Sequence, residues 1–74
     1  MDKETLLKKF GKNVKIERIK QDMTQEVLAE KMNVSQNYLA NIERGKENMS
    51  LWKIYNLSQC LGVSVNLLLD IPEI

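Results

Sequence analysis

The chain has 74 residues, of which 43% are hydrophobic and 28% are charged, and its formal net charge is +1. This length and balance are typical of one small folded domain, residues 1–74, and leave no room for a second core. One Cys and no His exclude an internal disulfide and nearly exclude a zinc site, so we expect no metal and no cofactor. Neither a signal peptide nor a membrane-length apolar run is present, and we expect a cytoplasmic protein without membrane contacts.

Apolar residues recur at spacings of three and four along the chain, which predicts helices and an all-α fold. A first helix is expected over residues 3–21. Its apolar stripe is formed by Leu6, Leu7, Phe10 and Val14. A second helix is expected over residues 25–32. The residues that this helix turns inward are expected to be Val27, Leu28, Ala29 and Met32.

Three more helices are expected in the second half of the chain. The third covers residues 36–44 and is anchored to the core by Leu39 and Ile42. The fourth covers residues 51–61 and the fifth residues 65–69. The apolar stripe of the fourth helix is formed by Leu51, Ile54, Leu57, Ser58 and Leu61. Off this stripe lie two aromatic residues, Trp52 and Tyr55.

Residues that favour helix ends divide the chain at the same places. A Ser or Thr precedes each of the four later helices, where its hydroxyl can accept a hydrogen bond from a free backbone N–H. These residues are Thr24, Ser35, Ser50 and Ser64. Gly45 and Gly62 are expected to end helices because glycine adopts the left-handed conformation without strain, and Asn33 can do so less easily.

The connection between the second and third helices is only residues 33–35. Such a short connection forces a sharp corner, and the small Ala29 lets the third helix pass close by, which is typical of a helix-turn-helix. The second helix of that motif lies in the DNA major groove, and an amide can pair with adenine through two hydrogen bonds. The expected outward face of the third helix is rich in amides and consists of Gln36, Asn37, Ala40 and Asn41.

The stretch MTQEVLAEKMNVSQNYLANIERGK, followed by SLWKIYNLSQCLGVSVNLLL, resembles the Xre/Cro family of bacterial and phage DNA-binding domains. The resemblance covers about residues 10–69 and implies a compact five-helix, lambda-repressor-like fold. It also implies sequence-specific binding of double-stranded DNA by a small transcriptional regulator. The length and residues 48–51 are similar to those of restriction-modification controller proteins, which dimerise through their last helix.

The resemblance further implies which residues contact DNA. The base-reading residues that it implies are Gln36, Asn37 and Asn41, and we add Ala40, because its small side chain allows a close approach and its methyl group can meet that of a thymine. The residues that it implies for the phosphate backbone are Gln25, Ser35, Tyr38, Arg44, Lys46 and Asn48. Partial packing against the protein is the alternative for Tyr38, and an ordinary solvated surface is the alternative for the other polar residues. Lys12 and Lys15 are weaker candidates for phosphate contacts.

Arg18 and Glu43 occupy positions where relatives in the family often pair an Arg of the first helix with a Glu at the end of the third. The resemblance therefore implies a partly buried ion pair that fixes the third helix, rather than two DNA contacts.

One recognition helix reads only a few base pairs, so we expect a homodimer on an inverted-repeat operator. The residues expected in the dimer interface are Trp52, Tyr55, Val65, Leu68 and Ile71. The alternative is that the C-terminal leucines close the core and Trp52 lies against it.

A protein-interaction module is the alternative interpretation, for example an antitoxin whose DNA binding is secondary. An enzyme is not expected, because one Cys without any His leaves no catalytic constellation. Cys60 lies among apolar residues and is expected to pack as a small hydrophobic side chain.

Overall fold

Five helices follow one another in the computed structural model, which describes residues 1–70. Their bounds are α1 (Lys3–Lys20), α2 (Gln25–Met32), α3 (Gln36–Glu43), α4 (Leu51–Leu61) and α5 (Val65–Leu69). The predicted all-α fold is confirmed, and no strand occurs within these residues. The first and third helices each end one residue earlier than expected, because Gln21 and Arg44 already cap them.

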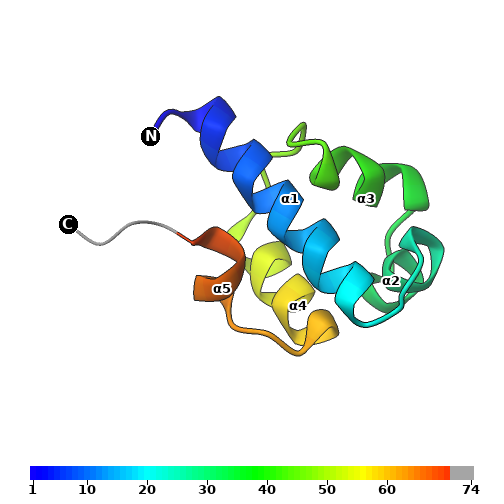
Figure 1. The fold of residues 1–74 in the computed structure, drawn as a ribbon. Helices are drawn as coiled ribbons and strands as arrows, with labels where there is room; N and C mark the ends of the chain where they lie inside the picture. Colours follow the sequence, from blue (N-terminus) through cyan, green and yellow to red (C-terminus); the bar gives the residue numbers. More distant parts are fainter. Residues whose placement is uncertain (71–74) are drawn as a thin grey trace.

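The helices pack around α1, which crosses the whole molecule in Figure 1. α1 contacts α3 on one side and α5 on the other, while α2 packs against both α3 and α4. α3 lies at the edge of the molecule, with one face turned to the core and the other to solvent (Figure 1). No helix within residues 1–70 has the length and apolar character that crossing a membrane would require.

Each helix begins at a residue whose side chain accepts a backbone hydrogen bond from the first turn, which satisfies one otherwise free N–H group. The predicted N-caps are confirmed, and these are Thr24, Ser35, Ser50 and Ser64. Asp2 caps α1 in the same way, with 2.8 Å between Thr5 N and Asp2 Oδ1. The left-handed ends are also as expected, with a φ of 58° at Asn33 and of 68° at Gly62.

The core draws on all five helices and on Met49, which lies in the loop before α4. Its residues are Phe10, Val14, Leu28, Ala29, Met32, Leu39, Ile42, Met49, Leu57, Leu61 and Leu68. Leu6 and Leu7, at the start of the first stripe, are only half-buried. Cys60 is half-buried and packs against the core, as expected.

Two residues expected in the core are exposed. Val27 is 43% exposed, because the inward direction of α2 is taken by Leu28 and Ala29, and Val27 points about 100° away from Leu28. Leu51 is 78% exposed, because Met49 rather than Leu51 fills the core at the start of α4. Both expectations were therefore wrong, although the helices that carry the two residues are in the expected places.

Leu68 is a third correction, because it was expected in a dimer interface and is completely buried. The amide of Asn13 on α1 donates a 2.8 Å hydrogen bond to the carbonyl oxygen of Leu68, which holds α5 against α1. The side chain of Leu68 is thereby used to close the core. Ile71, the other C-terminal residue of the expected interface, lies outside the described residues.

The end of α3 lies directly on α1 because two glycines leave room for it. A β-carbon at Gly11 would overlap the carbonyl oxygen of Ile42 and would lie 2.7 Å from that of Glu43. Gly45, which follows α3, has a φ of +77°, and a β-carbon there would lie 2.7 Å from the α-carbon of Lys8. The backbone of α1 therefore sets the position of the last turn of α3.

Candidate nucleic-acid interface

The corner between α2 and α3 is built by local hydrogen bonds. Asn33 adopts the left-handed conformation, and the N–H of Val34 then donates to the carbonyl oxygen of Ala29 at 3.0 Å. Val34 packs against the core, and the hydroxyl of Ser35 accepts from the N–H of Tyr38 at 3.0 Å. The direction in which α3 leaves the corner is thus fixed by residues 33–35 themselves.

α3 turns its polar residues to solvent. Leu39 and Ile42 are buried, while Gln36 and Asn37 are exposed and Ala40 and Asn41 are half-buried at the margin. The four residues expected to read bases therefore share the outward face of the helix. Two amides at its start and a small residue on the same face form a surface that can approach the edges of base pairs.

Asn41 is already engaged by a neighbour on the same surface. A terminal nitrogen of Arg44 donates to Oδ1 of Asn41, which uses one of the two lone pairs of that oxygen. Pairing with adenine requires both the donor and the acceptor of an amide. In this arrangement Asn41 shares its acceptor oxygen with Arg44, and the amide is wholly free for a base only when Arg44 swings away toward a phosphate.

The end of α3 is held by an ion pair between Arg18 and Glu43. Arg18 Nε lies 2.7 Å from Glu43 Oε2, and Arg18 Nη2 lies 3.1 Å from Glu43 Oε1. The two side chains are only 10% and 3% exposed. Arg18 also donates to the carbonyl oxygen of Met23 at 2.8 Å. The ion pair that the family resemblance implies is thus present, and Arg18 joins α1, the loop before α2 and the end of α3.

Gln25 takes part in the same network, which the sequence did not reveal. Its Nε2 donates to Glu43 Oε1 at 3.0 Å, so one N–H of the amide is used inside the protein. The carboxylate of Glu43 therefore accepts from both Arg18 and Gln25 and holds the first residue of α2 against the last residue of α3. Only the remaining N–H of the amide and the backbone N–H of Gln25 are left for a phosphate.

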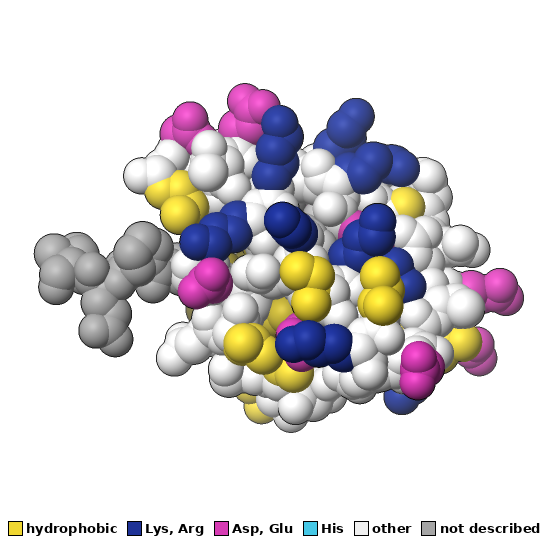
Figure 2. Space-filling model, viewed as in Figure 1, with side chains coloured by type: hydrophobic (Ala, Val, Ile, Leu, Met, Phe, Trp, Pro, Cys, Tyr) yellow, Lys and Arg dark blue, Asp and Glu magenta, His cyan; other side chains and the backbone are white. Residues whose placement is uncertain are grey.

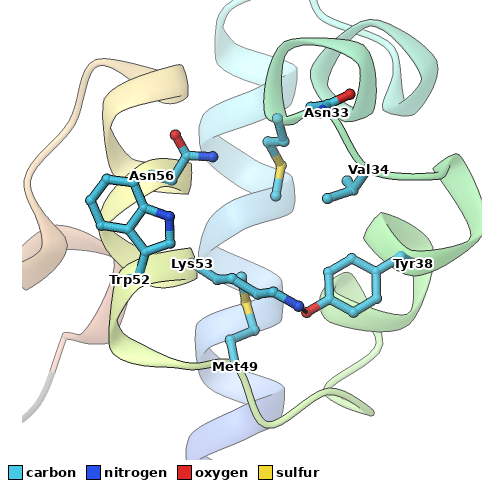
Figure 3. A pocket seen from close by; sticks show the side chains of 8 residues that line it. Asn33, Val34, Tyr38, Met49, Trp52, Lys53 and Asn56 are labelled. Atoms are coloured by element: carbon cyan, nitrogen blue, oxygen red, sulfur yellow. Dashed lines mark hydrogen bonds between the residues drawn. The ribbon is translucent and has the colours of Figure 1, made fainter.

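The other residues expected to contact phosphates lie on both sides of the outward face of α3. Ser35, Arg44, Lys46 and Asn48 are exposed. Tyr38 is half-buried and packs against the core, and Lys53 of α4 lies beside it, as Figure 3 shows. Lys53 Nζ is 3.5 Å from Tyr38 Oη and 5.0 Å from the centre of the ring. Nothing in the sequence pattern pointed to Lys53.

Three lysines of α1 are paired with carboxylates, so α1 offers fewer free charges to DNA phosphates than its number of lysines suggests. Lys8 pairs with Glu4 at 2.9 Å, Lys9 with Asp70 at 3.4 Å and Lys20 with Glu17 at 3.2 Å. The hydrogen bond from Lys8 raises the pKa of Lys8 and lowers the pKa of Glu4. Figure 2 shows the face of the molecule that is turned to the viewer in Figure 1. Lys and Arg side chains cross its middle and upper part, and most Asp and Glu side chains lie near its outline.

An apolar surface lies on the other side of α4. It is lined by Leu51, Trp52, Tyr55 and Val65, and we call it the α4–α5 surface. Trp52 is 70% exposed, and its ring centre lies 6.0 Å from that of Tyr55. Three residues expected in the dimer interface, Trp52, Tyr55 and Val65, thus lie together here. Leu51 lies with them, whereas Leu68 is buried in the core. Within residues 1–70, no cluster of Cys, Asp and Glu could hold a metal ion.

A family model described as helix-turn-helix matches residues 14–68, which include the corner, the outward face of α3 and the network around Glu43. The chain belongs to the helix-turn-helix family. Control protein C.BamHI of Bacillus amyloliquefaciens is 41% identical to this helix-turn-helix protein over 66 residues, which are 88% of this chain and 82% of the relative.

Solved structures of two controller proteins are similar to this helix-turn-helix protein. The restriction-modification controller protein C.AhdI from Aeromonas hydrophila has a TM-score of 0.80 and 32% identity, and the match covers 84% of this chain and 94% of C.AhdI. C.Esp1396I, solved as a tetramer with its natural 35 base-pair operator, has a TM-score of 0.77 and 32% identity. That match covers 88% of this chain and 86% of C.Esp1396I.

Proposed function

We propose that this helix-turn-helix protein is a dimeric transcriptional regulator that binds a specific double-stranded operator with α3 in the major groove. The observation that carries the proposal is the outward face of α3, where amides rather than Lys and Glu are presented by a helix fixed at both ends. The corner at residues 33–35 fixes its start, and the ion pair between Arg18 and Glu43 fixes its end.

The residues of the proposed contact fall into two groups. The residues that read bases are Gln36, Asn37, Ala40 and Asn41. The residues that hold the phosphate backbone are Gln25, Ser35, Tyr38, Arg44, Lys46 and Asn48. Base contacts supply specificity, whereas phosphate contacts supply register and the salt-dependent part of the affinity. The protein acts by occupying its site, not by catalysis, and it does so in the cytoplasm.

The biological setting that we propose is control of a restriction-modification system. Similarity to C.BamHI and C.AhdI along most of their length supports this setting. The tetramer of C.Esp1396I on a 35 base-pair operator supports an operator that holds more than one copy of the chain. A closed two-fold dimer needs one self-complementary patch. The α4–α5 surface, with its exposed Leu51 and Trp52, is the apolar patch that we assign to it.

Selection of binding sites from a random duplex library, at near-physiological salt, tests the proposal. The expected result is an enriched inverted repeat whose half-sites are about one helical turn apart. Enrichment of a single half-site would contradict the dimer and leave the reading of DNA intact. A library without enrichment, bound only in a salt-sensitive and sequence-independent way, would contradict specific operator binding.

A further inference from the structure

Lys53 carries a charge that its surroundings in the free protein do not balance. It lies in the first turn of α4, which contains no acidic residue, and the helix dipole disfavours a cation at that end. The ion pairs among residues 1–70 involve Lys8, Lys9, Arg18 and Lys20, and Lys53 is not among them. A bound anion would supply the missing negative charge.

The ammonium group of Lys53 is directed to one place by Tyr38. The side chain of Lys53 extends from α4 toward Tyr38 of α3 (Figure 3), and its Nζ lies 3.5 Å from the phenol oxygen. The two side chains border a cavity of about 190 Å³. The other residues that line it are Met32, Asn33, Val34, Met49, Trp52 and Asn56, and none of them is acidic. Lys53 is therefore the one charge at this cavity.

The hydrogen bond leaves two kinds of donor without a partner in this contact. Tyr38 Oη accepts from Lys53, so the phenol proton remains free to donate, and the ammonium group keeps two further protons. Two donors so close together suit an anion with more than one oxygen, such as a phosphodiester. Tyr38 belongs to α3, one residue after Asn37, and the sugar-phosphate backbone borders a helix that lies in the major groove.

We propose that Lys53 and Tyr38 together bind one phosphodiester of the DNA strand that flanks α3. The inference rests on the proposed function and adds to it a residue of α4 that carries charge. Lys53 neutralises the phosphate, and the phenol of Tyr38 donates to a second oxygen of the same phosphate and keeps the ammonium group in position. Register along the groove is then read by α3 and α4 jointly.

The salt dependence of DNA binding tests the role of Lys53. Each phosphate neutralised on duplex DNA contributes about 0.9 to the slope of log K against log salt. A bound dimer contains two copies of Lys53, so Lys53→Gln is expected to lower that slope by about 1.8 while keeping the sequence preference of the wild type. The matched control is Lys9→Gln, which removes the same charge beside Asp70 on the α5 side of α1 and is expected to leave the slope unchanged.

Tyr38→Phe tests the hydroxyl group of Tyr38 separately from the charge of Lys53. This variant keeps the ring beneath the ammonium group and removes only the hydroxyl, so we expect binding to weaken by about tenfold or more per half-site, the effect of one hydrogen bond to a charged group, with the wild-type slope. The measurement is fluorescence anisotropy with the selected operator and with a random-sequence duplex, from about 50 to 200 mM salt.

Several results would overturn the inference. If Lys53→Gln and Lys9→Gln have equal salt slopes, Lys53 does not contact a phosphate. If Lys53→Gln loses the same factor of DNA affinity at every salt concentration and also has a lower melting temperature, Lys53 is a structural residue. A site for free phosphate would show a different pattern. Inorganic phosphate alone would raise the melting temperature of the wild type but not of Lys53→Gln, while the two proteins would have equal salt slopes for DNA binding. Wild-type protein that binds neither duplex would overturn the proposed function itself.

Discussion

Gly11 of α1 and Ile42 of α3 meet through their backbones, with no side chain between them. The contact places the last turn of α3 directly against the backbone of α1. It also explains a glycine in the middle of an 18-residue helix, where it disfavours the helix by about 1 kcal/mol relative to alanine. The position of α3, the helix that we propose to read DNA, thus depends on the absence of one β-carbon.

Gly11→Ala is expected to destabilise the protein in spite of its better helix propensity. The new methyl group overlaps the carbonyl oxygen of Ile42, and we expect the free energy of unfolding to fall by about 1–3 kcal/mol in urea titrations. Gly62→Ala is the control, because it meets no atom within 4 Å and is strained only by its φ of +68°. An unchanged or raised stability of Gly11→Ala would contradict the close approach.

Glu43→Ala is expected to lower the free energy of unfolding by about 3–5 kcal/mol, because it leaves the buried guanidinium of Arg18 without its partner. The double variant Arg18→Met with Glu43→Leu removes both charges and is expected to recover much of this loss. Urea unfolding measures both. A loss below about 1 kcal/mol for Glu43→Ala would mean that the pair behaves like an exposed one.

The double variant Gln36→Ala with Asn37→Ala is expected to relax the choice of DNA sequence without changing stability, because both side chains are exposed. Each lost amide pairing is worth about 1–3 kcal/mol of discrimination between bases. The readout is a repeat of the library selection. Gln59→Ala, an exposed amide of α4, is the control. If the double variant enriches the wild-type site with equal strength, these residues do not read bases.

Trp52→Glu and Tyr55→Glu are each expected to shift sedimentation from dimer to monomer, because each places a charge in the α4–α5 surface. Ile19→Glu is the control, since Ile19 is an apolar residue of α1 that is 54% exposed and lies outside that surface. Leu68 would be an unsuitable test because it is completely buried and its replacement by Glu would unfold the core. Dimers that survive both substitutions would assign the interface elsewhere.

Acid is expected to weaken the start of α1 through Asp2. The hydrogen bond from the backbone N–H of Thr5 lowers the pKa of Asp2 below its ordinary value of 3.8. A lowered pKa stabilises the fold above the unfolded pKa, and this stability is lost as the pH falls through the folded pKa. Between pH about 5 and about 3, the wild type should therefore lose more melting temperature than Asp2→Asn, which caps without a charge. Parallel curves would contradict this.

The fold was predictable because local signals agree along the chain. Ser or Thr at the N-caps of the four later helices, a left-handed Asn33 and Gly62, and apolar spacing of three and four all follow from short-range chemistry. Val27 and Leu51 show where such reasoning fails. Periodicity predicts which residues of a helix can face inward, but the inward direction also depends on how neighbouring helices fill the core.

The candidate site was predictable only in part for the same reason. The outward face of α3 follows from its sequence, because its apolar residues occupy the opposite side. The hydrogen bond from Gln25 to Glu43 and the contact between Lys53 and Tyr38 join different helices, and no spacing within one helix can predict them. Gly11 did leave a signal, since a glycine inside a helix often has a packing reason.

Trp52 is the only tryptophan of the chain, and it lines both the cavity beside Lys53 and the α4–α5 surface. The protein therefore contains one indole fluorophore, which stands between the two places where partners are proposed to bind. Its emission moves to shorter wavelength when the ring leaves water, as a second copy would cause. Intrinsic fluorescence of the unmodified protein can thus follow assembly in real time.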